Sequence, residues 1–367
     1  MNGEQVLKTV NKFKTRGALS NPDGRFESMR HEAVDDGWDS PAPEEDTPKQ
    51  IAVTVLPDKA KTIINYNKSP DIPFDRSINP YRGCEHGCIY CFARPSHGYI
   101  GLSAGLDFET RLFYKEDAAA KLEQELSKPG YQCQPVTLGI NTDAYQPIER
   151  ERKITRGLLE VLLRFRHPVS LITKSRLILR DLDILGELAE QSLVSVAVSM
   201  TSLRTDIKST LEPRTSSPAK RLETIEQLAK AGVPVGVMVA PVIPFITDAE
   251  MEHILEAAYQ AGARSAGYVL LRLPHEVKDL FRQWLAEHYP DKAAHVMSLV
   301  RQSHGGKDYR AEWGVRMRGT GEYADMLAQR FHKACERIGF NAGRSRALAT
   351  HLFDAKRAVG GQLSFEF

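Results

Sequence analysis

Short runs of β-branched residues alternate with segments of helical spacing through the middle of this 367-residue chain. The runs are VTLGIN (136–141), VSLIT (169–173), LVSVAVSM (193–200), PVGVMVA (234–240) and AGYVLL (266–271). The helical segments between them are 152–165, 176–191, 218–231 and 248–261. Short apolar runs predict buried strands, and strands that alternate with helices predict a parallel sheet covered by helices.

A short strand near Ser77 to Pro80 precedes these runs and brings the number of βα units to about six, from roughly residue 75 to 290. The predicted fold class is therefore α/β. The periodicity leaves open whether the strands close into a barrel or end as an open arc. In both arrangements the active site lies at the carboxyl ends of the strands, so the loops that follow the strands are the candidates for chemistry.

Signals at the ends of the predicted helices agree with this arrangement. Pro218 after Ser217 suits the first turn of a helix that begins there. Gly232 suits the end of the same helix, and Thr247 with Glu250 predicts a capping box at the start of the next one. Local and long-range patterns therefore predict the same fold.

Composition divides the chain into three parts. Residues 1–60 form an N-terminal extension that we expect to be largely disordered, because 31–48 carries seven acids, three prolines and no Lys or Arg. Residues 61–290 form the core. Residues 291–367 form a basic helical C-terminal extension, in which 301–358 holds twelve Lys or Arg, six Asp or Glu and six aromatic residues. Such a segment can bind nucleic acid through phosphate contacts and stacking, or it can be the solvated face of helices.

The chain contains no stretch that approaches the ~20 apolar residues needed to span a bilayer. We therefore expect no membrane partner and a cytoplasmic protein. Five cysteines is an odd number and three of them are crowded together, so a disulfide framework is not expected. The net charge of +2 does not by itself imply a polyanionic partner.

The crowded cysteines stand in the stretch CEHGCIYC. Three thiols this close indicate a metal site. One interpretation is a structural zinc held by Cys84, Cys88, Cys91 and one histidine, His86 or His97, in a module without catalytic function. The other is a [4Fe–4S] cluster on the three cysteines, with one iron left open for an outside ligand. The spacing alone favours neither interpretation.

The CxxxCxxC spacing, with Tyr90 just before the last cysteine, resembles the radical S-adenosylmethionine (radical SAM) superfamily. The resemblance covers about residues 75–275. It is carried by NPYRGCEHGCIYC, INTDAYQPIE, ITKS, VSMTS and EPRTSSPAKRLETIEQLAKAGVPVGVMVAPVIP. The first and last of these stretches are similar to the spore photoproduct lyase branch and its uncharacterised bacterial relatives of the DNA repair photolyase type. The resemblance implies a partial (βα)6 barrel of the TIM type.

The resemblance also implies the cofactors. Cys84, Cys88 and Cys91 would hold a [4Fe–4S] cluster, and its open iron would take the amino and carboxylate groups of S-adenosylmethionine (SAM). One electron from a reductant such as flavodoxin or ferredoxin would then cleave SAM into methionine and a 5′-deoxyadenosyl radical. The protein would therefore be a lyase-like radical SAM enzyme, and the resemblance does not name further catalytic residues.

Six further residues are expected at the cofactor by the same resemblance. They are Tyr90 against the adenine, Thr142 and Asp143 after the second strand, Lys174 on the methionine carboxylate, Ser199 at the end of the fourth strand, and Arg214 on the cofactor or an anionic substrate. Four of them have a structural alternative. Lys174 could be a solvated loop lysine, Thr142 and Ser199 could cap turns, and Arg214 could brace its loop through Glu212.

The chain departs from the lyase pattern at two positions. The lyase has a hydrogen-donor cysteine just after the second strand, where this chain has Asn141 and Thr142, and its aromatic residue after the last cysteine is here Phe92, which has no hydroxyl. Cys133 precedes that strand and is expected near its opposite end, and Cys335 is expected in a helical core. Thymine-dimer reversal by the lyase's relay is therefore not expected. The substrate could be a nucleic acid in repair or modification, or alternatively a protein or a small molecule.

Overall fold

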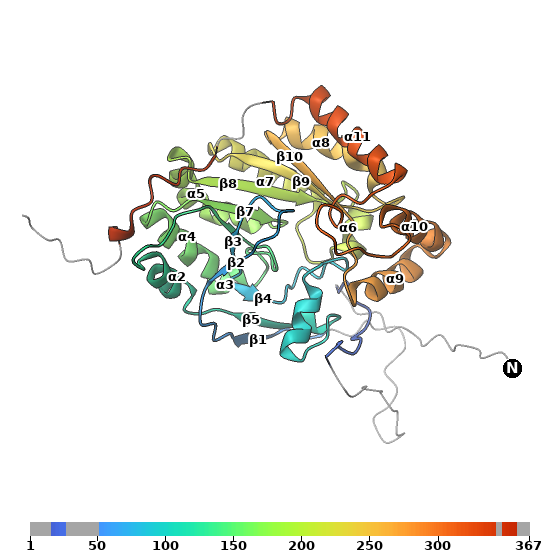
Figure 1. Ribbon diagram of the computed structural model, residues 1–367, viewed down its shortest axis with the longest axis horizontal. Coiled ribbons are helices and arrows are strands. Elements are labelled where there is room, and N and C mark those ends of the chain that lie inside the picture. The colour runs from blue at the N-terminus through green and yellow to red at the C-terminus, as the bar shows by residue number, and fades with distance from the viewer. Residues whose placement is uncertain (1–15, 27–50, 343–346, 358–367) are drawn as a thin grey trace, which may run out of the picture.

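The computed structural model describes residues 16–26, 51–342 and 347–357. Within these ranges the main sheet has seven strands in the order β10-β9-β8-β7-β6-β3-β2. Six of them are parallel: β3 (Arg76–Ile78), β6 (Val136–Leu138), β7 (Val169–Thr173), β8 (Val194–Met200), β9 (Val235–Val242) and β10 (Ser265–Leu270). They follow one another across the sheet in chain order (Figure 1), which confirms the predicted α/β arrangement.

The sheet is an open arc. Strand β2 (Ile64–Tyr66) pairs antiparallel with β3 and forms one edge, and β10 forms the other. Among the described strands no ladder joins these two edges, so the sheet is a partial barrel, as the family resemblance implied. A second sheet consists of β1 (Thr54–Pro57), β4 (Tyr81–Arg82) and β5 (Arg111–Tyr114). Its first two strands precede the cysteines in the sequence, and β5 follows them.

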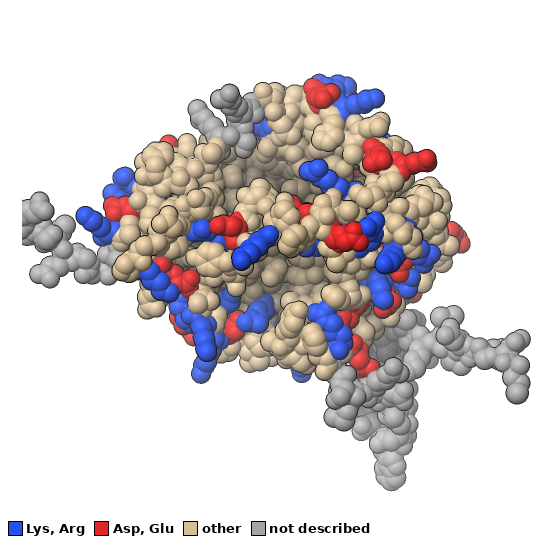
Figure 2. All heavy atoms as spheres, viewed as in Figure 1, with Lys and Arg blue, Asp and Glu red and all other residues tan. Residues whose placement is uncertain are grey.

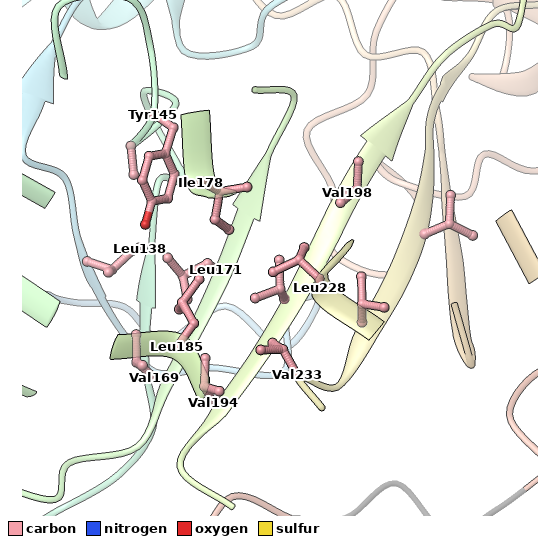
Figure 3. Close-up of a cluster of buried hydrophobic side chains, with 14 of the residues drawn as sticks. Leu138, Tyr145, Val169, Leu171, Ile178, Leu185, Val194, Val198, Leu228 and Val233 are labelled. Atoms are coloured by element: carbon pink, nitrogen blue, oxygen red, sulfur yellow. The ribbon is translucent and has the colours of Figure 1, made fainter. Parts of the chain in front are cut away.

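Helices pack against the main sheet and form the largest buried cluster with it. These helices are α2 (Ala118–Leu126), α4 (Ile154–Arg164), α5 (Leu182–Glu190), α7 (Pro218–Lys230) and α8 (Met251–Gln260). Figure 3 shows Leu185 of α5 and Leu228 of α7 in one cluster with Leu171, Val194 and Val198 of the strands. The β-branched and leucine side chains that predicted buried strands therefore form the interface with the helices.

The predicted start and end of α7 are confirmed. The Ser217 hydroxyl accepts a hydrogen bond from the backbone N–H of Lys220, which satisfies a donor of the first turn. Gly232 follows the helix with φ of 74°, in the left-handed region that glycine adopts without strain.

The predicted capping box before α8 is wrong. The Thr247 hydroxyl accepts the N–H of Ile243 at 2.9 Å and not an N–H of the helix. The Glu250 carboxylate accepts the N–H of Leu203 at 2.8 Å, in the loop after β8. Thr247 is used within the loop after β9 and Glu250 joins that region to the loop after β8, so the helix begins after a single 3-10 turn without a side-chain cap.

The C-terminal part of the chain is helical, as predicted. It contains α9 (Val277–His288), α10 (Pro290–Ser303) and α11 (Glu322–Ile338), and the short helices elsewhere are α1 (Asp107–Thr110), α3 (Glu149–Arg152) and α6 (Thr205–Leu211). Trp284 of α9 and Val296 of α10 share a buried cluster with Ile89 of the cysteine loop. Helix α11 lies against α8 and β10 (Figure 1), and its Cys335 is buried in the main core, as expected.

The expected N-terminal extension is in part well packed. Residues 16–19 are buried, so this stretch does not belong to a disordered tail. The acidic stretch 31–48 lies outside the described residues, as do 343–346 and 358–367 of the expected C-terminal extension. No helix in the described ranges is both long and apolar enough to cross a membrane.

Candidate active site

The cysteine loop, residues 83–92, begins directly after β4. Gly83 and Gly87 have φ of 75° and 68°, the left-handed region that favours glycine. A side chain at Gly87 would also collide with the Glu109 carboxylate, because its Cβ would lie 2.7 Å from Oε2. The resulting tight turns bury two of the three cysteines and half-bury the third: Cys84, Cys88 and Cys91, in that order.

A buried ion pair, Arg94 with Glu109, holds the backbone of the cysteine loop. Arg94 and Glu109 are both fully buried and pair with each other. Arg94 Nε also donates to the carbonyl oxygen of Cys88 at 2.9 Å. The Glu109 carboxylate accepts the N–H groups of Gly17 at 3.0 Å and Ala18 at 2.8 Å. The sequence predicted none of these contacts, and those of Glu109 with Gly17 and Ala18 join segments about ninety residues apart in the chain.

A cavity opens at the carboxyl ends of the strands. It holds about 1150 Å³ of space free of protein atoms, including its opening to solvent, and small-molecule sites are typically roughly 300–1,000 Å³. Figure 2 shows the face of the molecule hollowed over strands β8 to β10. Eight of the nine residues predicted from the sequence line the cavity, and they are Cys84, Cys88, Cys91, Tyr90, Thr142, Asp143, Lys174 and Ser199.

Two thiols of the loop hold their protons firmly in the protein alone. Burial raises the pKa of Cys84 well above its ordinary value, and burial with the nearby Glu212 raises the pKa of Cys88 to about 12. The nearby Lys174 opposes this effect and lowers the pKa of Cys88. A metal that binds here must displace protons.

The donor set of the loop fits a cluster. A [4Fe–4S] cluster is held by cysteine thiolates, and three of them leave one iron open for an outside ligand. Cys84, Cys88 and Cys91 line one cavity and supply these three thiols.

Asp143 joins the loops that follow β6 and β7 to the cysteine loop. Its carboxylate accepts the Thr173 hydroxyl at 2.7 Å and the Lys174 N–H at 2.8 Å, and it lies 3.3 Å from Nδ1 of His86. Burial alone would raise the pKa of Asp143, but His86 and the hydrogen bonds lower it below its ordinary value. The residue is therefore a buried carboxylate with both oxygens occupied.

The hydroxyls of Thr142 and Ser199 bond to backbone carbonyls. Thr142 donates to Tyr81 at 3.1 Å and is thereby tied to the strand before the cysteine loop. Ser199 donates to Ala240 at 3.3 Å, which is a long hydrogen bond for a hydroxyl. The Thr142 hydroxyl thus joins two segments and does not cap a turn, which was its alternative role, whereas Ser199 is only weakly engaged.

Tyr90 is fixed by a charged pair that the sequence analysis missed. Its hydroxyl donates to Glu212, which also accepts the Thr201 hydroxyl at 2.8 Å and pairs with Arg221. Burial opposes ionisation of Glu212, but Arg221 and Lys174 lower the pKa of this carboxyl to about 2. The only sequence signal for this network was the pair Glu212 and Arg221, which stand nine positions apart, one before α7 and one in its first turns.

Lys174 stands over Tyr90. Its Nζ lies 5.9 Å from the centroid of the Tyr90 ring. The ammonium group makes no hydrogen bond or ion pair with any residue that the structure describes. Burial opposes the charge of Lys174, but Cys88 and Glu212 raise its pKa, so the side chain is a cation at the cavity.

Arg214 is the one predicted residue that does not line the cavity. Its guanidinium donates to Glu85 at 3.0 Å, and its backbone N–H donates to the carbonyl of His86 at 3.2 Å. It therefore braces the cysteine loop directly. The alternative brace through Glu212 is wrong, because Glu212 pairs with Arg221.

The two histidines near the cysteines also have structural partners. His86 is paired with Asp143, as described above. His97 Nε2 lies 3.0 Å from the carbonyl oxygen of Arg111, and its ring packs edge-on against Phe108.

Sequence comparison agrees with this geometry. Residues 78–258 match the sequence profile of the Radical SAM superfamily. An uncharacterized protein of Mycobacterium tuberculosis is 37% identical over 241 residues, which are 64% of this chain and 71% of that protein. An uncharacterized protein of Methanocaldococcus jannaschii is 28% identical over 198 residues, which are 54% of this chain and 71% of that protein.

Solved structures share the fold. A spore photoproduct lyase variant is 17% identical and matches with a TM-score of 0.57 over 78% of this chain and 80% of its own. A second variant of that lyase, with bound AdoMet and dinucleoside spore photoproduct, has the same coverage and identity and a TM-score of 0.56. The superfamily match decides for an enzyme and against a zinc-held module without catalytic function. The chain belongs to the radical SAM superfamily and is a radical SAM enzyme, a class that uses a [4Fe–4S] cluster and SAM as its cofactors.

Proposed function

We propose that this enzyme acts on a nucleic acid, in repair or in modification, and that Cys84, Cys88 and Cys91 hold its cluster. When bound, the cluster and SAM supply a 5′-deoxyadenosyl radical, with the electron coming from a reductant such as flavodoxin or ferredoxin. The residues of the chain bind and orient the cofactor and exclude water from it. This assignment is supported by the burial of Cys84 and Cys88 within the cysteine loop.

Lys174 and Tyr90 are proposed to bind the two ends of SAM. The unpaired Lys174 ammonium suits the methionine carboxylate through a charge-assisted hydrogen bond. The Tyr90 ring, held by its hydroxyl on Glu212, offers a rigid face to the adenine. The Ser199 hydroxyl is weakly bonded at 3.3 Å and can turn toward the cofactor.

Thr142, Asp143 and Arg214 are proposed as positioning residues. Asp143 fixes the backbone of Lys174, and Thr142 fixes the turn after β6. Arg214 holds the cysteine loop through Glu85. Binding residues whose supports are themselves hydrogen-bonded keep the geometry that radical chemistry needs.

The observation that carries the nucleic-acid proposal is the loop between α10 and α11, residues 304–321. Met317 of this loop lines the cavity, and its carbonyl oxygen accepts the N–H of Leu270 at 2.9 Å. Trp313 is 61% exposed, and Arg318 is exposed. Met317 places this loop at the cavity, and the exposed indole and guanidinium of the loop suit a strand whose bases stack and whose phosphates are paired.

The same loop is anchored across the open side of the barrel. Asp71, in the loop between β2 and β3, pairs with Arg316 and accepts the N–H of Gly314 at 2.6 Å. These contacts hold the loop 304–321 at the cavity. The dinucleoside spore photoproduct in the lyase structures of similar fold gives further support to a substrate of this class.

The test is SAM cleavage by protein reconstituted with iron and sulfide without oxygen and reduced with dithionite. We expect single-stranded DNA or RNA to raise the rate of 5′-deoxyadenosine formation, with an affinity that falls steeply as salt is raised. Arg318→Gln should weaken this stimulation, whereas Arg150→Gln, at an exposed arginine of α3, should not. Stimulation by peptides or small molecules alone would overturn the nucleic-acid proposal in favour of those substrates.

A further inference from the structure

Arg272 lines the cavity and has no hydrogen-bond or ion-pair partner among the described residues. It lies two residues after the end of β10 and lines the cavity with Lys174. Its Nε is buried and has no hydrogen-bond acceptor, and its guanidinium makes no ion pair with any described residue. Buried donors without acceptors are rare in native proteins, because each costs free energy.

The Arg272 side chain is held in place by an aromatic ring. Its guanidinium carbon lies 4.8 Å from the centroid of the Phe92 ring, and Phe92 follows Cys91 directly. Phe92 also lines the cavity and is 39% exposed. A guanidinium stacked on a ring keeps its in-plane N–H donors free, so it can bind an anion while it is stacked.

The backbone that carries Arg272 is rigid. The preceding Leu271 donates its N–H to Val242 of β9 at 3.0 Å, and its carbonyl oxygen lies 3.2 Å from Nε2 of the buried His304. Binding groups on such a fixed mount lose little conformational entropy when a ligand arrives.

The charges in the cavity leave room for a second anion. Asp143 is the one carboxylate among the described lining residues, and both of its oxygens are occupied by hydrogen bonds. The nearby Asp71 is used by Arg316 and Gly314. Lys174 and Arg272 are therefore two cations that make no ion pair with a described residue, although Lys174 lies near Glu212 and Arg272 near Asp71. If Lys174 takes the carboxylate of SAM, Arg272 is left for an anion of the substrate.

We propose that Arg272 binds a phosphate of the substrate strand and that Phe92 packs against the neighbouring base. This inference rests on the proposed function and assigns the substrate end of the same cavity. A phosphate is favoured over a carboxylate because the loop that lines the cavity through Met317 also carries the exposed Trp313 and Arg318, which suit further bases and phosphates of a strand. Arg272 is thus a substrate-binding residue and Phe92 its aromatic platform.

The experiment compares two fluorescent probes on the reconstituted full chain. One is a short single-stranded oligothymidylate, and the other is its methylphosphonate analogue, which has the same bases and no backbone charge at the substituted positions. Fluorescence anisotropy gives the affinity of each probe for wild type, Arg272→Gln, Arg272→Lys, Phe92→Leu and the surface control Arg150→Gln. Iron content and thermal unfolding are measured for every variant to exclude loss of the cluster or of the fold.

We expect Arg272→Gln to weaken binding of the phosphate probe about tenfold or more and to leave the neutral probe unchanged. Arg272→Lys should fall between wild type and Arg272→Gln, because it keeps the charge and loses the planar fork of donors. Phe92→Leu should weaken both probes, and Arg150→Gln neither.

Two results would overturn the inference, and they are distinguishable. If wild type binds the phosphate probe and Arg272→Gln binds it equally well, the assignment of Arg272 is wrong and the nucleic-acid proposal stands. If wild type binds no oligonucleotide, while peptides stimulate SAM cleavage, the proposed function falls and this inference falls with it.

Discussion

The backbone N–H of Lys174 donates a 2.8 Å hydrogen bond to the carboxylate of Asp143, which follows the neighbouring strand. The same carboxylate contacts His86 of the cysteine loop. One buried acid therefore sets the positions of a cluster-loop residue and of the cation that we assign to the cofactor. The spacing between the cysteine loop and Lys174 is thus set by contacts within the protein.

Replacing Lys174 with methionine should weaken SAM binding. The change keeps an apolar chain of similar length and removes the ammonium group that pairs with the carboxylate, so the dissociation constant should rise about tenfold or more. The change in the reduced-cluster electron paramagnetic resonance signal during titration with SAM measures this constant. Lys278→Met, at an exposed lysine of α9, is the matched control and should bind SAM as wild type does. Equal affinities for both variants would contradict the assignment.

Each cysteine of the loop should be required for the cluster. Cys84→Ala, Cys88→Ala and Cys91→Ala should each lower iron and sulfide content after reconstitution and abolish the signal of the reduced cluster. Cys133→Ala should keep full iron content, because Cys133 precedes β6 and is not among the residues that line the cavity. Normal iron loading in any of the three loop variants would show that the cysteine concerned is not a ligand.

The sequence predicted the elements of the core well because their signal is local. VSLIT is strand β7 at its predicted bounds. A short β-branched run between two helices is typical of a buried strand. The cysteines and Lys174 were found because they stand in a compact motif or directly after a strand. Glu109 and Arg94 were not found, because their role depends on Gly17 and on a fold that brings the three together.

Gly17→Ala should detach the N-terminal segment from the cysteine loop. A Cβ at this position would lie 1.8 Å from the carbonyl oxygen of Gly87, so the segment must move. We expect a loss of roughly 1–3 kcal/mol in the free energy of unfolding, with faster amide exchange at residues 16–20. Gly98→Ala is the matched control, since its Cβ would meet Phe26 at 3.4 Å, an ordinary contact. Unchanged exchange in Gly17→Ala would show that the segment is not seated on the loop.

His167 should make the stability of the protein depend on pH in mildly acidic solution. The residue is fully buried between α4 and β7, and its Nε2 lies 2.9 Å from the Tyr131 hydroxyl. Burial lowers the pKa of His167 from 6.5 to about 4, although a hydrogen bond with the carbonyl of Pro168 acts in the opposite direction. Between these two values the unfolded chain binds a proton that the folded chain does not.

Because the folded pKa is the lower one, the contribution of His167 is fully present above pH 6.5 and is lost as the pH falls toward 4. The free energy of unfolding should therefore fall by about 2 kcal/mol more in wild type than in His167→Gln between pH 7.5 and pH 5. Urea unfolding at the two pH values measures this difference, and taking it between the two proteins removes the contribution of other titrating groups. Parallel losses in both proteins would mean that the imidazole is protonated in the folded state, at odds with its burial beside Tyr131.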